Sequence, residues 1–139
     1  MDDYRQRVQE GFDGQPFMKH LGARLDSVSE GMCEISVPFS ESLTQQHGFF
    51  HAGVTATLAD NAGGFAAYSL MAYDEQPLTV EFKINLLEKA VGEQMIARAT
   101  VLRNGRTLKV SHVEVFARAA GVETRIAVAI VTVIATRVR

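Results

Sequence analysis

The stretch from residue 47 to residue 69, HGFFHAGVTATLADNAGGFAAYS, constrains the fold more than any other part of the chain. From about His51 it contains no proline and is rich in alanine, leucine, valine and phenylalanine, which predicts one long helix. At 100° per residue, one side of this helix carries only small side chains and a single carboxylate: Gly53, Ala56, Thr57, Asp60, Gly63, Gly64 and Ala67. The opposite side is apolar. Such a helix is usually covered on both sides, so we expect Asp60 to be half-buried.

The rest of the sequence predicts a short helix and six strands. Tyr4, Val8 and Phe12 lie at helical spacing, which indicates an amphipathic N-terminal helix within residues 1–13. Strand patterns cover residues 23–30, 32–39, 78–86, 93–103, 107–117 and 122–137. The dipeptide Asn104-Gly105 predicts a hairpin between the fourth and fifth of these strands.

The strand after Pro77 has the clearest alternation of apolar and polar residues. One face is predicted to be solvent-exposed or to face a ligand. The other face is predicted to be apolar and is formed by Leu78, Val80, Phe82, Ile84 and Leu86. Thr79 belongs to the polar face in this pattern.

These elements predict an α+β fold in a single domain that spans residues 1–139. A mainly antiparallel sheet with one long helix has one economical packing, in which the sheet curls around the helix and buries it. A chain of this length buries enough apolar surface for one core without a disulfide or a metal ion.

Composition excludes several classes of function. The single cysteine, Cys33, cannot form an intramolecular disulfide, and its place on an apolar strand face indicates a small buried side chain. Four scattered histidines give no metal-binding spacing, and a net charge of −2 without a basic face argues against nucleic-acid binding. The longest apolar stretch, residues 126–135, is too short for a membrane span, and no signal peptide is apparent. A cytoplasmic location is therefore expected.

The tripeptide HAG at the start of the long helix, with Asp60 nine residues after His51, resembles the hotdog-fold acyl-CoA thioesterases of the phenylacetate-degradation (PaaI-like) type. The signature of that family is an Asn, a Gly, His-Gly-Gly and an Asp nine residues after the His, followed by a strand such as LTVEFKINLLEKA. This sequence keeps the spacing but has Gln45 and Ala52 where the family has Asn and Gly. The resemblance covers roughly residues 14–136 and implies a hotdog fold.

Thioester hydrolysis explains these residue types. The reaction needs an activated water and a place for negative charge on the carbonyl oxygen. Asp60 would act as the general base or as the nucleophile, and the helix start near His51 would offer the backbone amides of Ala52 and Gly53 as oxyanion donors. By the resemblance, Gln45 would orient the water or the carbonyl, and Thr79 would help to hold the water.

The resemblance also implies an acyl-CoA substrate, with coenzyme A as part of the substrate and no separate cofactor. Gly48 and Phe50 are candidate substrate contacts, and aromatic residues around the helix would suit an aryl or medium-chain acyl group. Arg103 and Arg106 flank the predicted hairpin and could meet coenzyme A phosphates; the alternative is that they are solvated turn residues.

Helix geometry predicts that one chain cannot form the site alone. Asp60 lies about 13 Å along the helix and about 180° around it from His51. Asp60 and the start of the helix in one chain therefore cannot both act on the carbonyl group of one substrate. Two antiparallel helices would bring Asp60 of one chain near the helix start of another, so we expect a dimer or a tetramer. Two other functions stay open: a non-catalytic acyl-CoA-binding hotdog protein, and a hotdog enoyl-CoA hydratase or dehydratase, for which the required His and acid spacing is absent.

Overall fold

The computed structural model describes residues 3–137. The helices are α1 (Tyr4–Asp13), α2 (Pro16–Leu21) and α3 (Ala52–Tyr68), with a one-turn 3-10 helix at Glu41–Leu43. The strands are β1 (Arg24–Ser29), β2 (Met32–Pro38), β3 (Glu75–Leu86), β4 (Gln94–Asn104), β5 (Leu108–Ala119) and β6 (Val122–Arg137). The predicted order of a short helix, two strands, a long helix and four strands is therefore confirmed.

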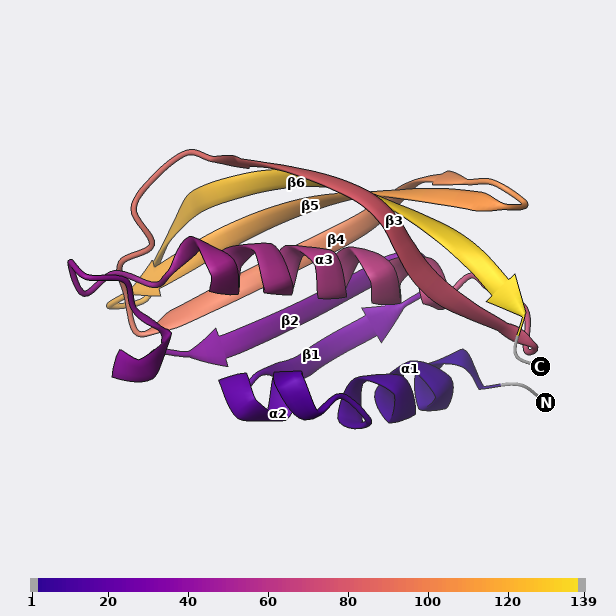
Figure 1. Ribbon diagram of the computed structural model, residues 1–139, viewed down its shortest axis with the longest axis horizontal. Helices are drawn as coiled ribbons and strands as arrows, with labels where there is room; N and C mark the ends of the chain where they lie inside the picture. Colours follow the sequence, from indigo (N-terminus) through magenta and orange to yellow (C-terminus); the bar gives the residue numbers. More distant parts are fainter. Residues whose placement is uncertain (1–2, 138–139) are drawn as a thin grey trace.

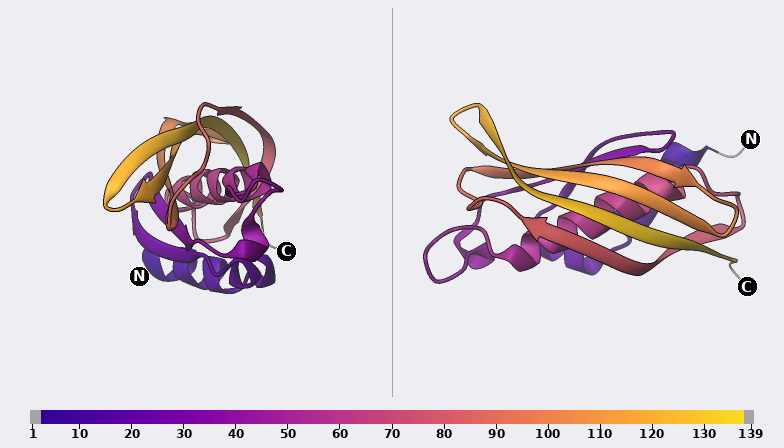
Figure 2. Two further views of the ribbon diagram at one scale, coloured as in Figure 1. Left: turned by 90° about the vertical axis from the view of Figure 1, so that its left-hand side faces the viewer. Right: turned by 90° about the horizontal axis from the view of Figure 1, so that it is seen from above.

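All six strands form one antiparallel sheet in the order β1-β2-β4-β5-β6-β3. The sheet curves around α3 so that the helix lies along its concave face (Figure 1). Seen nearly along the helix, the sheet encloses α3 on most sides, while α1 and α2 cover part of the remaining opening (Figure 2). The predicted α+β hotdog fold is confirmed.

The core lies between α3 and the concave face of the sheet, and its closest contact is made at Gly63. A Cβ atom on Gly63 would lie 2.9 Å from the Val131 side chain, so only glycine lets the helix approach β6 this closely. The hydroxyl of Ser111 on β5 donates a hydrogen bond of 2.9 Å to the Gly63 carbonyl in the buried interface. Gly63 therefore lies at the sheet-facing edge of the predicted small side, next to Asp60, which contacts the neighbouring strand β3.

Helix α1 packs its apolar side onto the rest of the domain. The Asp3 side chain caps its first turn by accepting a hydrogen bond from the Arg5 amide, and Val8 and Phe12 are buried beneath it. The ring of Phe12 meets Phe65 of α3 edge-on, with 6.0 Å between centroids. The N-terminal helix thus forms part of the wall beside the small side of α3.

Strand β3 departs from the predicted alternation because of a bulge at Val80. Thr79 pairs with Val133 and Glu81 pairs with Thr132, so Val80 is an extra residue that shifts every following side chain to the other face. Thr79 lies just before the bulge and points toward α3, so Leu78 faces away and is 57% exposed. After the bulge, Phe82 and Leu86 pair with the buried residues Val131 and Ala127, which places them on the concave face, where they are still 43% and 57% exposed. The prediction of one continuous buried apolar face on this strand is wrong.

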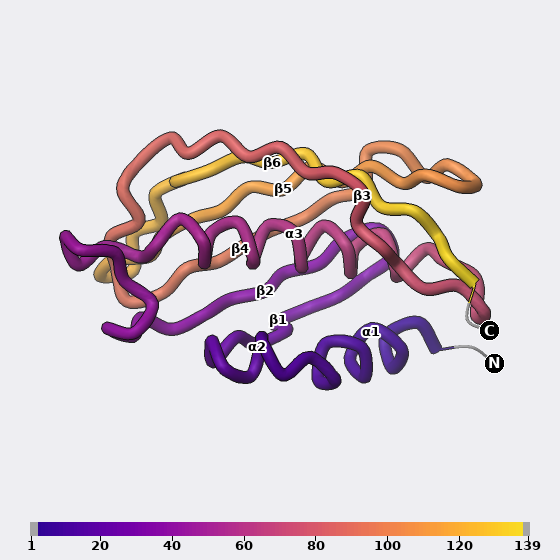
Figure 3. The backbone as a smooth tube through the Cα atoms, in the orientation of Figure 1, coloured from indigo at the N-terminus to yellow at the C-terminus, as the bar shows by residue number. Residues whose placement is uncertain are grey.

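The predicted hairpin between β4 and β5 is present, with residues 105–107 as its connection. The ammonium group of Lys109 holds this turn by donating hydrogen bonds to the Asn104 side chain (2.7 Å) and the Gly105 carbonyl (3.0 Å). The backbone tube shows the hairpin at the end of the molecule where α3 finishes, opposite the loop that precedes α3 (Figure 3).

Cys33 lies on the concave face of β2 and is 3% exposed, which confirms its predicted burial. Burial, together with the charges of Asp26 and Glu34, raises the pKa of this thiol to about 12. Among residues 3–137, no helix is both long and apolar enough to cross a membrane, and no group of three or more potential ligand side chains could hold a metal ion.

Candidate active site

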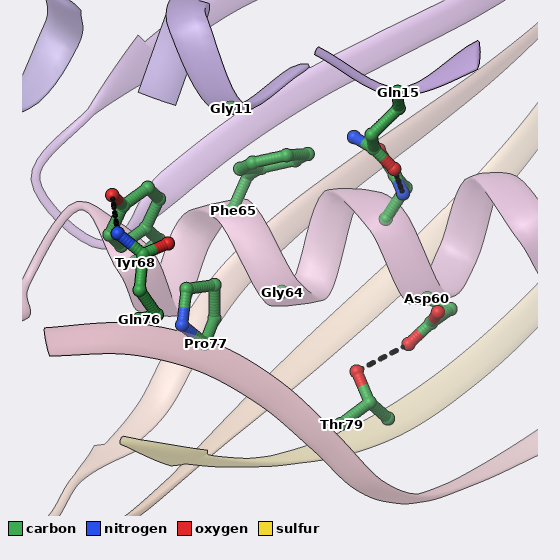
Figure 4. Close-up of a pocket in the computed structure, with 10 residues that line it drawn as sticks. Gly11, Gln15, Asp60, Gly64, Phe65, Tyr68, Gln76, Pro77 and Thr79 are labelled. Carbon is green, nitrogen blue, oxygen red and sulfur yellow. Dashed lines mark hydrogen bonds between the residues drawn. The ribbon is translucent and has the colours of Figure 1, made fainter. Parts of the chain in front are cut away.

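Asp60 and Thr79, which the sequence places in the site, are in direct contact. The Thr79 hydroxyl donates a hydrogen bond of 2.7 Å to Oδ1 of Asp60, across the gap between α3 and β3 (Figure 4). Asp60 is half-buried, as predicted. A hydrogen bond to an ionised carboxylate is among the stronger kinds, so it fixes the Asp60 side chain while Oδ2 stays available.

A cavity of about 240 Å³ opens beside this carboxylate. Its walls come from the end of α1, the middle of α3 and the start of β3. Two polar pairs lie around it: Gln15 with Asn61, joined by amide hydrogen bonds of 3.3 and 2.9 Å, and Gln76 with the Tyr68 hydroxyl at 2.9 Å. The aromatic ring of Phe65 also lines the cavity. Its lining therefore combines aromatic rings with amide side chains and the Asp60 carboxylate.

Sequence reasoning missed most of these wall residues. Gln15 and Asn61 are 46 positions apart, and no pattern in the sequence relates them. Gln76 precedes the predicted strand and carries no motif. Only Tyr68 and Phe65 had a signal, as aromatic residues on the predicted helix.

The start of α3 is capped by His51. The Nδ1 atom of His51 accepts a hydrogen bond of 2.8 Å from the Gly53 amide, so the proton of the neutral ring lies on Nε2. Of the two predicted oxyanion donors, the Gly53 amide is thus already engaged. The Ala52 amide makes no hydrogen bond within residues 3–137 and is exposed. Ala52 is also not among the residues with positive φ, so its methyl group causes no backbone strain.

The loop before α3 is organised by Gln45. Its side-chain oxygen accepts hydrogen bonds from the backbone amides of His47 and Phe49, and its backbone N–H donates a hydrogen bond of 2.9 Å to the Phe49 carbonyl. Gly48 closes this turn with a φ of 83°, a conformation that favours glycine. The side-chain oxygen of Gln45 therefore holds the loop, and its side-chain nitrogen Nε2 makes no hydrogen bond within residues 3–137.

A second cavity, of about 370 Å³, lies at the start of α3. Gln45, Phe50 and Ala52 line it, whereas Asp60 and Thr79 do not, and no residue lines both cavities. Phe50 is buried and meets Phe39 edge-on at 5.4 Å. Within one chain the predicted site residues are therefore divided between two places.

The remaining candidates lie elsewhere. His51 and Gly53 line a separate groove on the side of α3 that faces α2. Arg103 and Arg106 are exposed at the hairpin near the end of α3, far along the molecule from the helix start (Figure 1). One chain does not bring these arginines to Ala52 or Asp60.

A curved antiparallel sheet around one long helix is the hotdog arrangement, and here the helix carries a held carboxylate and an unused amide at its start. The chain belongs to the thioesterase superfamily, because the model of the family described as "Thioesterase superfamily" matches residues 47–124.

Individual relatives agree with this membership. A solved thioesterase family protein from Silicibacter pomeroyi is 44% identical, with a TM-score of 0.96 over 98% of this chain and 100% of that chain. A protein of Halobacterium salinarum that is classed among the esterases is 31% identical over 82% of this chain and 78% of its own length. The 1,4-dihydroxy-2-naphthoyl-CoA hydrolase of Listeria monocytogenes is 24% identical over 68% of this chain and 77% of its length.

The PaaI protein from the phenylacetic acid degradation operon of E. coli shares the fold, with a TM-score of 0.82 over 98% of this chain and 94% of that one, at 19% identity. The family match and the more similar relatives confirm the resemblance to hotdog thioesterases of the PaaI-like type, and the PaaI structure agrees with it in fold.

Proposed function

We propose that this protein hydrolyses the thioester of an aryl or medium-chain acyl-CoA, with Asp60 as the general base or nucleophile. The observation that carries the proposal is the Asp60 carboxylate, half-buried and held by Thr79 at the wall of a cavity. The unused Ala52 amide at the positive end of α3 is the oxyanion donor in this proposal.

With Asp60 as base, a water oxygen attacks the thioester carbonyl carbon while Asp60 takes one water proton. The carbonyl oxygen becomes negatively charged and accepts a hydrogen bond from the Ala52 amide. Collapse of the tetrahedral intermediate breaks the carbon–sulfur bond, and the leaving thiolate takes the proton held by Asp60, which restores the carboxylate. The products are a carboxylic acid and free coenzyme A. With Asp60 as nucleophile, the carboxylate attacks instead, and water then hydrolyses the resulting anhydride.

The cavity beside Asp60 is our candidate for the acyl group. Phe65 and Tyr68 give it aromatic walls, and the Gln76 amide lies at the Tyr68 end. The relative from Listeria monocytogenes is named for a naphthoyl-CoA substrate, which supports an aromatic acyl group here. Comparing kcat/KM for thiol release from benzoyl, phenylacetyl and straight-chain acyl-CoAs under the same conditions would show which acyl group the enzyme prefers.

A dimer is part of the proposal because the two halves of the site lie apart on α3. Ala52 and Asp60 are eight residues apart, which is about 12 Å along a helix axis. Strand β3 is at the edge of the sheet and exposes apolar side chains on both of its faces, Leu78 on one and Phe82 and Leu86 on the other, so that this edge is an apolar surface. Pairing of two such edges in antiparallel fashion would cover this surface and bring each Asp60 toward the other chain's helix start.

The first experiment measures thiol release from a panel of acyl-CoAs. Asp60→Asn keeps the size of the side chain and should lower kcat by a factor of about 100 or more. Asp74→Asn is the matched control, because Asp74 is an exposed acid whose nearest cation is Arg137 at 3.9 Å. Turnover that survives Asp60→Asn would contradict the mechanism, and coenzyme A binding without any thiol release would favour the non-catalytic alternative.

A second experiment tests whether each site uses two chains. Ala52→Pro removes only the proposed oxyanion amide, since Ala52 is the first residue of α3 and His51 has the extended conformation (φ −65°, ψ 140°) that precedes proline. When inactive Ala52→Pro and Asp60→Asn chains are unfolded and refolded together, mixed dimers contain one intact site, and about one quarter of wild-type activity should return. No recovery, with mixed dimers demonstrated, would place both groups of a site in one chain.

A further inference from the structure

Gly64 occupies an interior position of α3 and lines the cavity beside Asp60. Glycine is unfavourable inside a helix, so its presence there calls for a physical reason. The backbone supplies none, because Gly64 is not among the residues with positive φ. Packing supplies none either, since a Cβ atom at this position would meet nothing within 4 Å in the described part of the chain. Gly63 differs, because its Cβ atom would collide with Val131.

A side chain at position 64 would occupy the cavity itself. Asp60, Gly64 and Tyr68 are spaced four residues apart, so they follow one ridge of the helix. This ridge has a carboxylate at one end, open space at Gly64 and a phenol at the other end (Figure 4). Along the helix axis, Gly64 is about 6 Å and Tyr68 about 12 Å from Asp60. The ridge therefore leaves room for a group that extends from the carboxylate toward the phenol.

The aromatic walls of the cavity are held in place by several contacts. The buried ring of Phe65 lies 6.0 Å from that of Phe12 and 6.3 Å from that of Tyr68, measured between centroids. Tyr68 is 4% exposed; its hydroxyl accepts a hydrogen bond of 2.9 Å from Gln76, and the Arg7 guanidinium lies 5.0 Å from the centre of its ring. These rings cannot close over Gly64 without breaking such contacts, so the space stays open.

We propose that Gly64 determines which acyl groups the protein accepts, by leaving room for the part of the acyl group beyond its first two carbons. The inference rests on the proposed thioesterase function. When the thioester carbonyl lies beside Asp60, the methyl group of an acetyl thioester is one bond away from the carbonyl carbon and stays short of Gly64. A phenylacetyl or hexanoyl group continues along the ridge, over Gly64 and toward Tyr68. A side chain at position 64 therefore obstructs the larger groups and leaves acetyl unaffected.

The test compares kcat/KM for phenylacetyl-CoA and hexanoyl-CoA with kcat/KM for acetyl-CoA, all measured by thiol release. One methylene more or less in an apolar pocket changes such a ratio by about 10- to 200-fold. We expect Gly64→Ala to lower the phenylacetyl-to-acetyl and hexanoyl-to-acetyl ratios at least about tenfold, and Gly64→Leu to lower them further. Each ratio is independent of the fraction of folded enzyme, so a loss of stability cannot imitate this result.

Gly63→Ala is the matched control, because it adds the same methyl group one residue earlier, on the side of α3 that faces the sheet. It should lower stability and leave both ratios unchanged. Sedimentation of Gly64→Ala tests whether the helix of a second copy occupies the open space instead. A weakened dimer with unaltered ratios, an equal loss with all three thioesters, or unaltered ratios in both Gly64 variants would overturn the inference.

Calorimetric binding of phenylacetyl-CoA and acetyl-CoA tests Gly64 without turnover. If the wild type hydrolyses no thioester, the proposed function fails. In that case an affinity loss of about tenfold in Gly64→Ala, confined to phenylacetyl-CoA, upholds the role of Gly64, and equal effects on both ligands overturn it. If hydrolysis depends on Asp60 while both Gly64 variants keep the wild-type ratios, the role of Gly64 alone fails.

Discussion

Two adjacent glycines of α3 allow a sharp test of how the helix is packed. A Cβ atom on Gly63 would lie 2.9 Å from both Cβ and Cγ2 of Val131 and 3.3 Å from Val113, whereas one on Gly64 would meet nothing within 4 Å. Alanine in place of glycine inside a helix stabilises it by about 1 kcal/mol. Gly64→Ala should therefore raise the free energy of unfolding by up to about 1 kcal/mol.

For Gly63→Ala the same gain is opposed by overpacking. Val131 is fully buried and β-branched, so it cannot rotate away, and an extra methyl group in such a core costs about 1 to 3 kcal/mol or more. We expect a net loss of about 1 to 2 kcal/mol and a difference of about 2 to 3 kcal/mol between the two variants.

Urea unfolding followed by circular dichroism measures both values directly. Adding Val131→Ala to Gly63→Ala should recover part of the loss, because it removes the atoms in collision. The predicted packing of α3 against β6 is refuted if Gly63→Ala is as stable as Gly64→Ala.

Three further predictions concern other parts of the chain. Hydrogen bonds from Arg98 and Arg118 lower the pKa of Glu123 to about 2, so Glu123→Gln should cost about 1 to 2 kcal/mol at pH 7. That deficit should disappear as the pH falls from about 5 toward 2, since protonation removes the same interaction from the wild type; a pH-independent deficit would argue against it. Burial raises the pKa of Cys33 to about 12, so thiol reagents at pH 8 should label it only as fast as the protein unfolds, and rapid labelling of the native protein would contradict this. His51→Ala should cost about 1 kcal/mol in thermal unfolding by removing the helix cap, and His51→Asn, which can cap, should cost less.

The sequence was sufficient for the fold where side-chain periodicity and packing agree. The long helix, the six strands and the β4–β5 hairpin follow from local patterns, because their apolar residues lie on the side that the core covers. The sequence was not sufficient to predict the faces of β3, where the alternation of Leu78, Val80, Phe82 and Leu86 predicts a single apolar face. A single bulge at Val80 changes which face each later side chain joins, and a bulge that depends on pairing with β6 has no local signature.

The same distinction explains what could be predicted of the site. Asp60 could be predicted because a carboxylate among small residues is unusual on a helix, and Thr79 because the resemblance to PaaI-like thioesterases places a Ser or Thr at this position. Gln15 and Asn61 could not be found in this way, because they are 46 positions apart in the sequence and meet only once the helices pack against one another. Whether a buried polar group is satisfied depends on every element packed around it, so such binding groups become visible only in three dimensions.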